Sequence, residues 1–87
     1  MSGRLRNGLS LQQDRALRDA ADGVLGKDPL SWFCIGRSGR RYSGKTVYSL
    51  FSRDLVALGG NIIRGRRRVE ITAKGRDLLN GQEGSAA

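Results

Sequence analysis

The segment GRRYSGKT, residues 39–46, has the spacing of a phosphate-binding loop. Gly39 is followed by four residues and then by Gly44, Lys45 and Thr46, which satisfies the pattern G-x-x-x-x-G-K-[ST]. In nucleotide hydrolases this loop joins a buried parallel strand to a helix, and an acidic residue at another strand end holds magnesium. The chain offers neither a series of strand–helix units nor a hydrophobic strand that ends in aspartate. The sequence therefore predicts that this segment is not the loop of a nucleotide hydrolase.

Other kinds of catalysis lack their usual residues as well. The chain has no histidine, the most common general base, and its acids show no pair placed to shift each other's pKa. A metal site would lack ligands beyond Cys34, which lies in an apolar run and is expected to be a buried small side chain. A dyad of Ser43 and Lys45 is an alternative that the sequence leaves open. We therefore expect a non-catalytic protein that has no metal and no cofactor.

The positive charge is concentrated in one region of the chain. The net charge is +8, and residues 37–69 contain nine basic residues against the single acid Asp54, a surplus of eight. The basic and acidic residues outside this stretch are therefore equal in number. A surface that binds a polyanion requires such a concentration, whereas scattered solubilising lysines would not produce it. The nine basic residues are Arg37, Arg40, Arg41, Lys45, Arg53, Arg64, Arg66, Arg67 and Arg68.

The length of 87 residues suits one domain with a modest core, since a chain of this size buries only about 60% of its unfolded surface. We expect a folded domain over residues 9–80, a disordered basic N-terminus at 1–8 and a disordered tail at 81–87. No apolar run approaches the roughly 20 residues that span a bilayer, and the N-terminus lacks the hydrophobic segment of a signal peptide. The expected location is the cytoplasm, without membrane contact.

The first half of the chain predicts a helix followed by a hairpin. Ser10 and Gln13 have the spacing of a capping box, so a helix is expected over residues 11–22. Residues 32–35, WFCI, favour a strand, and a turn then leads to a short return strand at 41–42. The same pattern predicts that the side chains of Trp32, Phe33 and Phe51 are buried.

A second helix is expected over residues 45–53, opened by Ser43. Asp54 would fall in the apolar stripe if the helix continued, so we expect the helix to end near Arg53, with Asp54 in the left-handed conformation and Leu55-Val56 leaving as a strand. An end at Gly59-Gly60 is the alternative. The side chains expected to face a nucleic-acid groove are Lys45, Thr46, Ser49, Ser52 and Arg53.

The last third predicts a second hairpin, over residues 61–72, with a basic tip around Gly65. Thr72 then caps a final helix from Ala73 to about Asn80. A basic loop, a helix and a basic hairpin thus follow one another, and a helix of this kind can enter a major groove while arginines follow the backbone or reach a minor groove. The arginines expected to contact phosphates are Arg37, Arg40, Arg41, Arg64, Arg66, Arg67 and Arg68.

Residues 43–79 resemble the winged helix-turn-helix domains of bacterial regulators. The resemblance rests on TVYSL (46–50), RDLV (53–56) and VEITAKGRDLL (69–79), which are similar to the patterns T-V-x-x-L, G-L-[VI] and I-T-x-x-G-R-x-L-L. It implies that residues 45–53 are a recognition helix and residues 65–68 the tip of a wing. The chain departs from the family where Asp54 replaces the usual glycine, and where a hairpin is expected in place of the helix before the recognition helix. A helix over residues 30–42 is the alternative.

We therefore expect a small α+β winged-helix-like domain of order α-β-β-α-β-β-α that binds double-stranded DNA, as in a small transcriptional regulator. A homodimer is a further expectation, because small winged-helix proteins commonly double their contacts in this way. One alternative is an RNA-binding module, for which only Tyr42 or Tyr48 would be available to stack on bases. The other is an adaptor or toxin-like regulator whose basic face meets an acidic protein.

Overall fold

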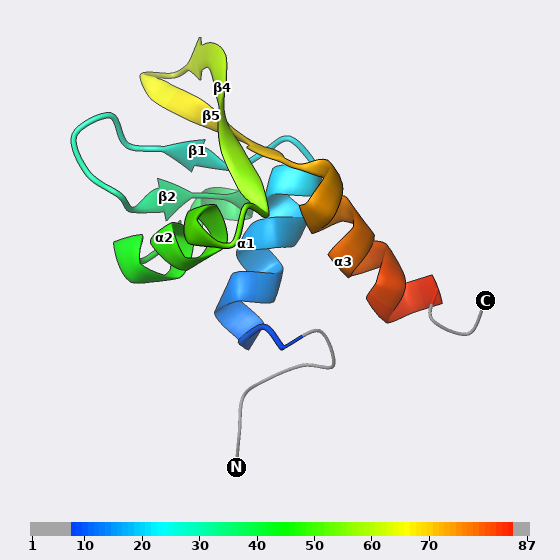
Figure 1. Ribbon diagram of the computed structural model, residues 1–87. Helices are drawn as coiled ribbons and strands as arrows, with labels where there is room; N and C mark the ends of the chain where they lie inside the picture. The colour runs from blue at the N-terminus through cyan, green and yellow to red at the C-terminus, as the bar shows by residue number, and fades with distance from the viewer. Residues whose placement is uncertain (1–7, 85–87) are drawn as a thin grey trace.

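The computed structural model describes residues 8–84, with only the backbone described at 63 and 81–84 (Figure 1). The segments expected to be disordered, 1–8 and 81–87, lie outside these residues except for Gly8 and residues 81–84. The fold is α+β, as expected. Its elements are α1 (Leu11–Ala21), β1 (Gly26–Lys27), β2 (Cys34–Ile35), the 3₁₀ turn η1 (Arg37–Gly39), β3 (Arg41–Tyr42), α2 (Gly44–Ser52), β4 (Val56–Ile63), β5 (Arg66–Ile71) and α3 (Ala73–Gly84).

The strands form one antiparallel sheet in the order β3-β2-β1-β5-β4. The strand β1 is absent from the predicted order α-β-β-α-β-β-α. Gly26 and Lys27 pair with β2 on one side and with β5 on the other, so this strand is defined by partners distant in sequence. A two-residue strand carries no alternating pattern that a sequence could reveal. The winged-helix order is therefore not reproduced in full.

The predicted helix caps are confirmed. The Ser10 hydroxyl accepts a hydrogen bond from the Gln13 N–H at 3.2 Å, and the Gln13 side chain accepts one from the Ser10 N–H at 2.8 Å. Ser43 caps α2 by accepting from the Thr46 N–H at 3.2 Å. Thr72 caps α3 by accepting from the Gly75 N–H at 3.0 Å. The first helix ends at Ala21, next to the predicted end, whereas α3 continues past the expected end near Asn80 to Gly84.

The exit from α2 also follows the prediction. Asp54 has φ of 61°, in the left-handed region, and α2 ends at Ser52. The alternative of a helix reaching Gly59-Gly60 is wrong, because these glycines lie inside β4. Strand β4 is continuous from Val56 to Ile63 and carries a register shift relative to β5 between Leu58 and Ile62.

The helices lie toward one face of the sheet (Figure 1). Between them, the buried side chains of the described residues form one hydrophobic core. The helix α1 packs against α2, α3 and β5. On β5 the side chain of Val69 is fully buried, so the alternation of a strand directs Arg68 and Glu70 to the opposite face. The main buried side chains are Leu9, Leu17, Leu25, Cys34, Tyr42, Val47, Leu50, Leu55 and Val69.

A buried carboxylate ties α1 to the β2–β3 hairpin. Asp19 is 7% exposed, and its Oδ2 atom accepts hydrogen bonds from the Tyr42 hydroxyl at 2.7 Å and from the Arg37 N–H at 3.1 Å. A Cβ at Gly36 would collide with this carboxylate, so the chain needs glycine there. The left-handed φ of 59° at Ser38 then reverses the chain into β3. Strands β2 and β3 pair antiparallel, so the predicted hairpin before α2 is confirmed and the alternative of a helix over residues 30–42 is wrong.

Candidate nucleic-acid interface

A projecting hairpin carries most of the predicted phosphate-binding residues (Figure 1). Ile63 at the end of β4 pairs with Arg66 at the start of β5, so only two residues form the turn. Both have positive φ, 55° at Arg64 and 76° at Gly65. Two left-handed residues in succession are typical of the type I′ turn, whose twist matches that of the flanking strands. The turn therefore places the Arg64 side chain at the very end of the hairpin.

The arginines after the turn alternate between the two faces of the sheet. Lys27 pairs with Arg67 and Gly26 pairs with Arg68 across β1 and β5. Because Val69 is buried against the helices, Arg67 and Lys27 lie on the helix-bearing face, whereas Arg66 and Arg68 lie on the other. The sequence prediction treated these arginines as one tip. The structure distributes them over both faces of one ribbon.

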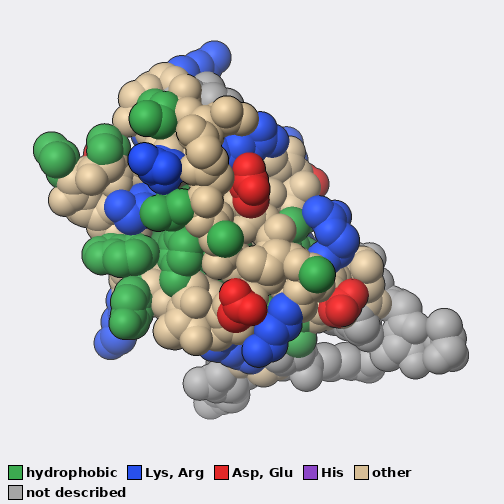
Figure 2. All heavy atoms as spheres, turned by 45° about the horizontal axis from the view of Figure 1, so that its top comes forward, with side chains coloured by type: hydrophobic (Ala, Val, Ile, Leu, Met, Phe, Trp, Pro, Cys, Tyr) green, Lys and Arg blue, Asp and Glu red, His purple; other side chains and the backbone are tan. Residues whose placement is uncertain are grey.

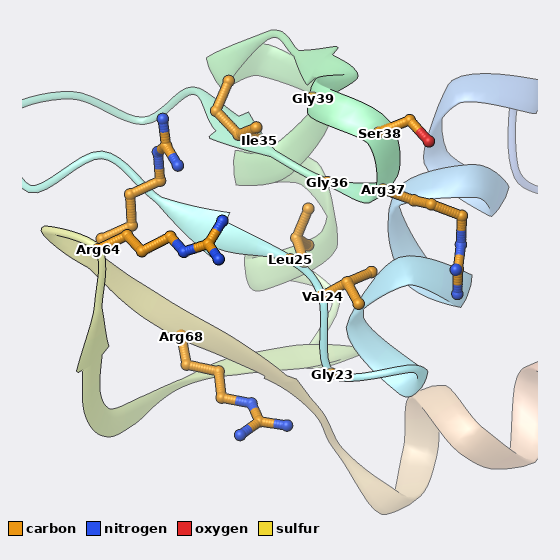
Figure 3. A pocket seen from close by; sticks show the side chains of 12 residues that line it. Gly23, Val24, Leu25, Ile35, Gly36, Arg37, Ser38, Gly39, Arg64 and Arg68 are labelled. Atoms are coloured by element: carbon orange, nitrogen blue, oxygen red, sulfur yellow. The ribbon is translucent and has the colours of Figure 1, made fainter.

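The face opposite the helices contains a hollow of about 750 Å³, which we call the arginine hollow. Arg64 and Arg68 extend from the hairpin on one side of it, residues 23–25 lie in the middle, and Arg37 lies on the other side with its side chain beside α1 (Figure 3). No acid is among the residues that line it. The arginine side chains of the lining are those of Arg37, Arg64, Arg66 and Arg68.

Three of the four arginines that line the hollow have no ion-pair partner among the described residues. Arg37 donates to the Asp22 carboxylate at 2.6 Å, so its charge is partly offset. Within the described residues, no ion pair involves Arg64, Arg66 or Arg68. The Arg68 guanidinium lies against Gly23, where φ is 78° and a Cβ would collide with it. Because Gly23 has no side chain, the Arg68 side chain has room to lie across the sheet.

The other predicted loop arginines lie away from the hollow. The Arg41 guanidinium lies 4.0 Å from the centre of the Phe33 ring, a cation–π contact at the β3 edge. Arg40 is exposed and borders a second, mixed-charge hollow together with Arg15 and Asp22. The structure therefore joins Arg37 to the hairpin arginines, but not Arg40 or Arg41.

The outer face of α2 is narrower than the sequence predicted. Lys45, Ser52 and Arg53 are exposed, whereas Thr46 and Ser49 are half-buried. The Ser49 hydroxyl donates to the Thr46 carbonyl at 2.7 Å and accepts from the Gln13 side chain of α1 at 2.6 Å. The Thr46 hydroxyl lies 3.0 Å from that of Ser43. The Ser49 hydroxyl thus links α2 to α1, and the Thr46 hydroxyl contacts the cap of its own helix, whereas the other three predicted side chains are open to solvent.

The structure also exposes aromatic side chains that were predicted to be buried. Trp32 is 43% exposed, so that prediction is wrong, and Phe33 and Phe51 are half-buried. The strand β2 begins only at Cys34, which leaves Trp32 in the preceding loop. Tyr42 is 2% exposed and bonded to Asp19, so the idea that it could stack on a base is wrong as well.

Trp32 belongs to a cluster at the surface of α2. Its ring meets Tyr48 at 5.5 Å and Phe51 at 5.4 Å between ring centres, both edge to face. Tyr48 is 57% exposed, and the Lys27 Nζ atom lies 5.0 Å from the Trp32 ring centre. We call Trp32, Tyr48, Lys27 and Arg67 the aromatic–basic surface. On the corresponding side of the molecule, Figure 2 shows hydrophobic side chains gathered with Lys and Arg side chains among them.

A signal for this cluster was present in the sequence. A Cβ at Gly44, the only glycine of α2, would lie 2.9 Å from the Trp32 Cβ, so glycine at this position leaves room for the tryptophan. Tyr48 lies three residues after Lys45 and four before Ser52, on the same outer stripe of the helix. Helical spacing alone could therefore have placed Tyr48 on the same stripe as Lys45 and Ser52.

The segment 39–46 does not have the geometry of a hydrolase phosphate loop. Its strand, β3, lies within the motif and pairs antiparallel with β2. Lys45 is exposed in the first turn of α2, where a helix N-terminus favours anions. Among the described residues there is no group of three or more His, Cys, Asp or Glu side chains that could hold a metal ion. Nor does any helix in this part of the chain have the length and apolarity to cross a membrane.

Comparison of the chain with protein-family models, with curated proteins and with solved structures gave no match. The similarity of residues 43–79 to winged helix-turn-helix domains therefore stays a prediction.

Proposed function

We propose that the protein binds double-stranded DNA without catalysis, through the β4–β5 hairpin and the exposed face of α2, as a small transcriptional regulator would. The observation that carries the proposal is the placement of the hairpin arginines. Arg64 lies at the end of the ribbon, Arg66 and Arg68 on one face and Arg67 on the other.

A two-stranded ribbon fits the major groove of B-DNA. With arginines on both faces, such a ribbon can contact the phosphates of both groove walls, and these contacts position a protein without reading sequence. The helix α2 packs against β4 on the face toward which Arg67 points. Lys45, Ser52 and Arg53 would then meet base edges or phosphates beside the hairpin.

The first test is the salt dependence of binding to a blunt duplex of mixed sequence, measured by fluorescence anisotropy of the labelled DNA. Replacing Arg66, Arg67 and Arg68 together by alanine should flatten the plot of log K against log salt by about three units, because each neutralised phosphate contributes roughly 0.9 unit to the slope. Replacing Arg15, Lys74 and Arg76 by alanine removes the same charge from the exposed surfaces of α1 and α3. This matched control should leave the slope nearly unchanged.

Competition separates the proposal from its rivals. Duplex DNA, duplex RNA and an acidic polypeptide are added in turn to the labelled complex, and DNA should compete best. Preferential displacement by RNA or by the polypeptide would favour an RNA-binding module or a protein adaptor instead. Absence of binding to any nucleic acid at low salt would refute the proposal.

A homodimer would double the contacts with a two-fold symmetric site. Sedimentation of the free protein and of the complex gives the number of chains per duplex.

A further inference from the structure

We propose that the aromatic–basic surface binds an unpaired nucleobase, so that the preferred ligand is a duplex with an adjoining single strand. The inference rests on the proposed function, because the hairpin arginines hold the duplex. It adds a second contact, made by Trp32 and Tyr48, with the first bases beyond the paired region.

The two aromatic side chains form a contiguous exposed patch. Single exposed hydrophobic residues are ordinary on a protein surface, whereas adjoining ones mark interaction sites. Trp32 and Tyr48 are 43% and 57% exposed and lie in edge-to-face contact. The exposed part of each side chain could therefore pack against a nucleobase without a change in the fold.

The loop that carries Trp32 is held in place by its own hydrogen bonds. The Asp28 carboxylate accepts from the Leu30 N–H at 2.9 Å, and the Asp28 N–H donates to the Phe33 carbonyl at 3.1 Å. The Trp32 ring rests against Phe51 beneath it. A pre-positioned aromatic ring loses little conformational freedom when a base stacks on it.

The charges around the patch select a nucleic acid over an apolar partner. The Lys27 ammonium lies over the Trp32 ring and donates to the Asp28 carbonyl, not to a carboxylate. Arg67 is the register partner of Lys27 on the same face of the sheet. Phosphates flank each nucleobase in a strand, and aromatic platforms beside cations are the usual means of holding single strands.

The patch and the arginine hollow lie on opposite faces of the same sheet, joined by the β5 strand. Arg67 belongs to the patch, while its neighbours Arg66 and Arg68 line the hollow. A straight duplex continues as a stiff rod, whereas an unpaired strand can bend around a sheet edge. A junction between paired and unpaired regions therefore fits both surfaces at once.

Trp32 is the only tryptophan of the chain, so its fluorescence reports on the patch alone. The probes are a blunt hairpin duplex, the same duplex with a six-nucleotide thymidine overhang, and that duplex with an overhang of abasic sites. The thymidine overhang should bind about tenfold more tightly than the blunt duplex and should quench Trp32. The abasic overhang keeps the phosphates but lacks the bases, so it should retain only part of the gain in affinity and should not quench Trp32.

Variants test the same point without relying on Trp32. Tyr48→Ala, at an exposed helix position, should bring the affinity for the thymidine overhang close to that for the blunt duplex, and Tyr48→Phe should restore the difference. Replacing Arg66 and Arg68 by alanine should weaken both complexes by the same factor.

The outcomes separate the two proposals. Equal binding of all three probes without quenching overturns the patch proposal and leaves the proposed function intact, whereas no binding of any probe overturns the proposed function. Quenching by the abasic overhang equal to that by thymidine means that phosphates act alone, which also overturns the role of stacking. Displacement of the overhang by an acidic peptide that quenches Trp32 as strongly assigns the patch to a protein partner.

Discussion

At the scale of single residues, the contact between Tyr42 and Asp19 links the hairpin before α2 to the first helix. The Tyr42 hydroxyl donates to the carboxylate of Asp19, a residue that is 7% exposed, and the same carboxylate oxygen also accepts a hydrogen bond from the Arg37 N–H. Burial, and then the bond to Asp19, raise the pKa of the Tyr42 phenol above its ordinary value of 10.0. The hydroxyl therefore acts as a donor throughout the neutral range.

Tyr42→Phe should lower the free energy of unfolding by about 1–3 kcal/mol, because a buried acceptor loses its partner. The matched control is Tyr48→Phe, whose hydroxyl makes no hydrogen bond within the described residues; it should change stability by less than about 0.5 kcal/mol. Urea unfolding measures both.

The same substitution has a pH dependence of defined sign. Because the pKa of Tyr42 is raised in the folded protein, its contribution is fully present below pH 10.0 and is lost as the pH rises above that value. Above pH 10.0, the difference in free energy of unfolding between wild type and Tyr42→Phe should therefore decrease. A gap that widens with pH would contradict the assigned hydrogen bond.

Cys34 should behave as a structural thiol. It is fully buried, and burial raises the pKa of the thiol from 9.0 to about 12, against a smaller opposing effect of Lys27. Since the thiolate is the reactive form, a disulfide reagent at pH 8 should modify the native protein far more slowly than the urea-unfolded chain. Equal rates in both states would show that Cys34 is accessible.

At the scale of elements, the sequence predicted what neighbouring residues determine. Ser10 with Gln13, Ser43 and Thr72 each mark a helix start through a bond three residues away, and all three bonds form. The strand β1 was missed because its two residues gain their role from β2 and β5. The face of each hairpin arginine likewise depends on pairing register, which a glycine turn alone does not determine.

Asp54 provides a test of this local reasoning. Its φ of 61° costs an ordinary side chain about 1 kcal/mol, and its carbonyl accepts from the Thr72 hydroxyl whatever side chain it carries. Asp54→Gly should therefore raise the free energy of unfolding by about 0.5–1 kcal/mol, whereas Asp54→Val should lower it by more than about 1 kcal/mol. Thermal and urea unfolding provide the measurement, with Asp54→Asn expected to stay near wild type. A loss of stability in Asp54→Gly would mean that the carboxylate itself stabilises the turn.

At the scale of the whole molecule, the structure shows on which faces the side chains behind the net charge of +8 lie, which the sequence alone did not show. The hairpin carries its arginines on two faces, and each face adjoins a different surface, the arginine hollow or the aromatic–basic surface. A single ligand could use both faces, or each face could hold a ligand of its own. These two arrangements differ in the number of duplexes bound per chain. They also differ in whether the effects of separate arginine substitutions on the salt dependence of binding add up.

If one blunt duplex contacts both faces, Arg67→Ala should reduce the salt slope by about 0.9 unit and the pair Arg66→Ala with Arg68→Ala by about 1.8 units, with the effects adding in the triple variant. Arg67→Lys keeps the charge and should retain the wild-type slope, although it removes the hydrogen bond that the Arg67 guanidinium donates to the Gly59 carbonyl. Calorimetry should then give one duplex for each protein chain or dimer. Two duplexes per chain, with each variant abolishing one binding event and sparing the other, would instead mean that the sheet separates two independent sites. In that case the β4–β5 hairpin would bind a separate duplex on each face and would not insert into the major groove of one duplex.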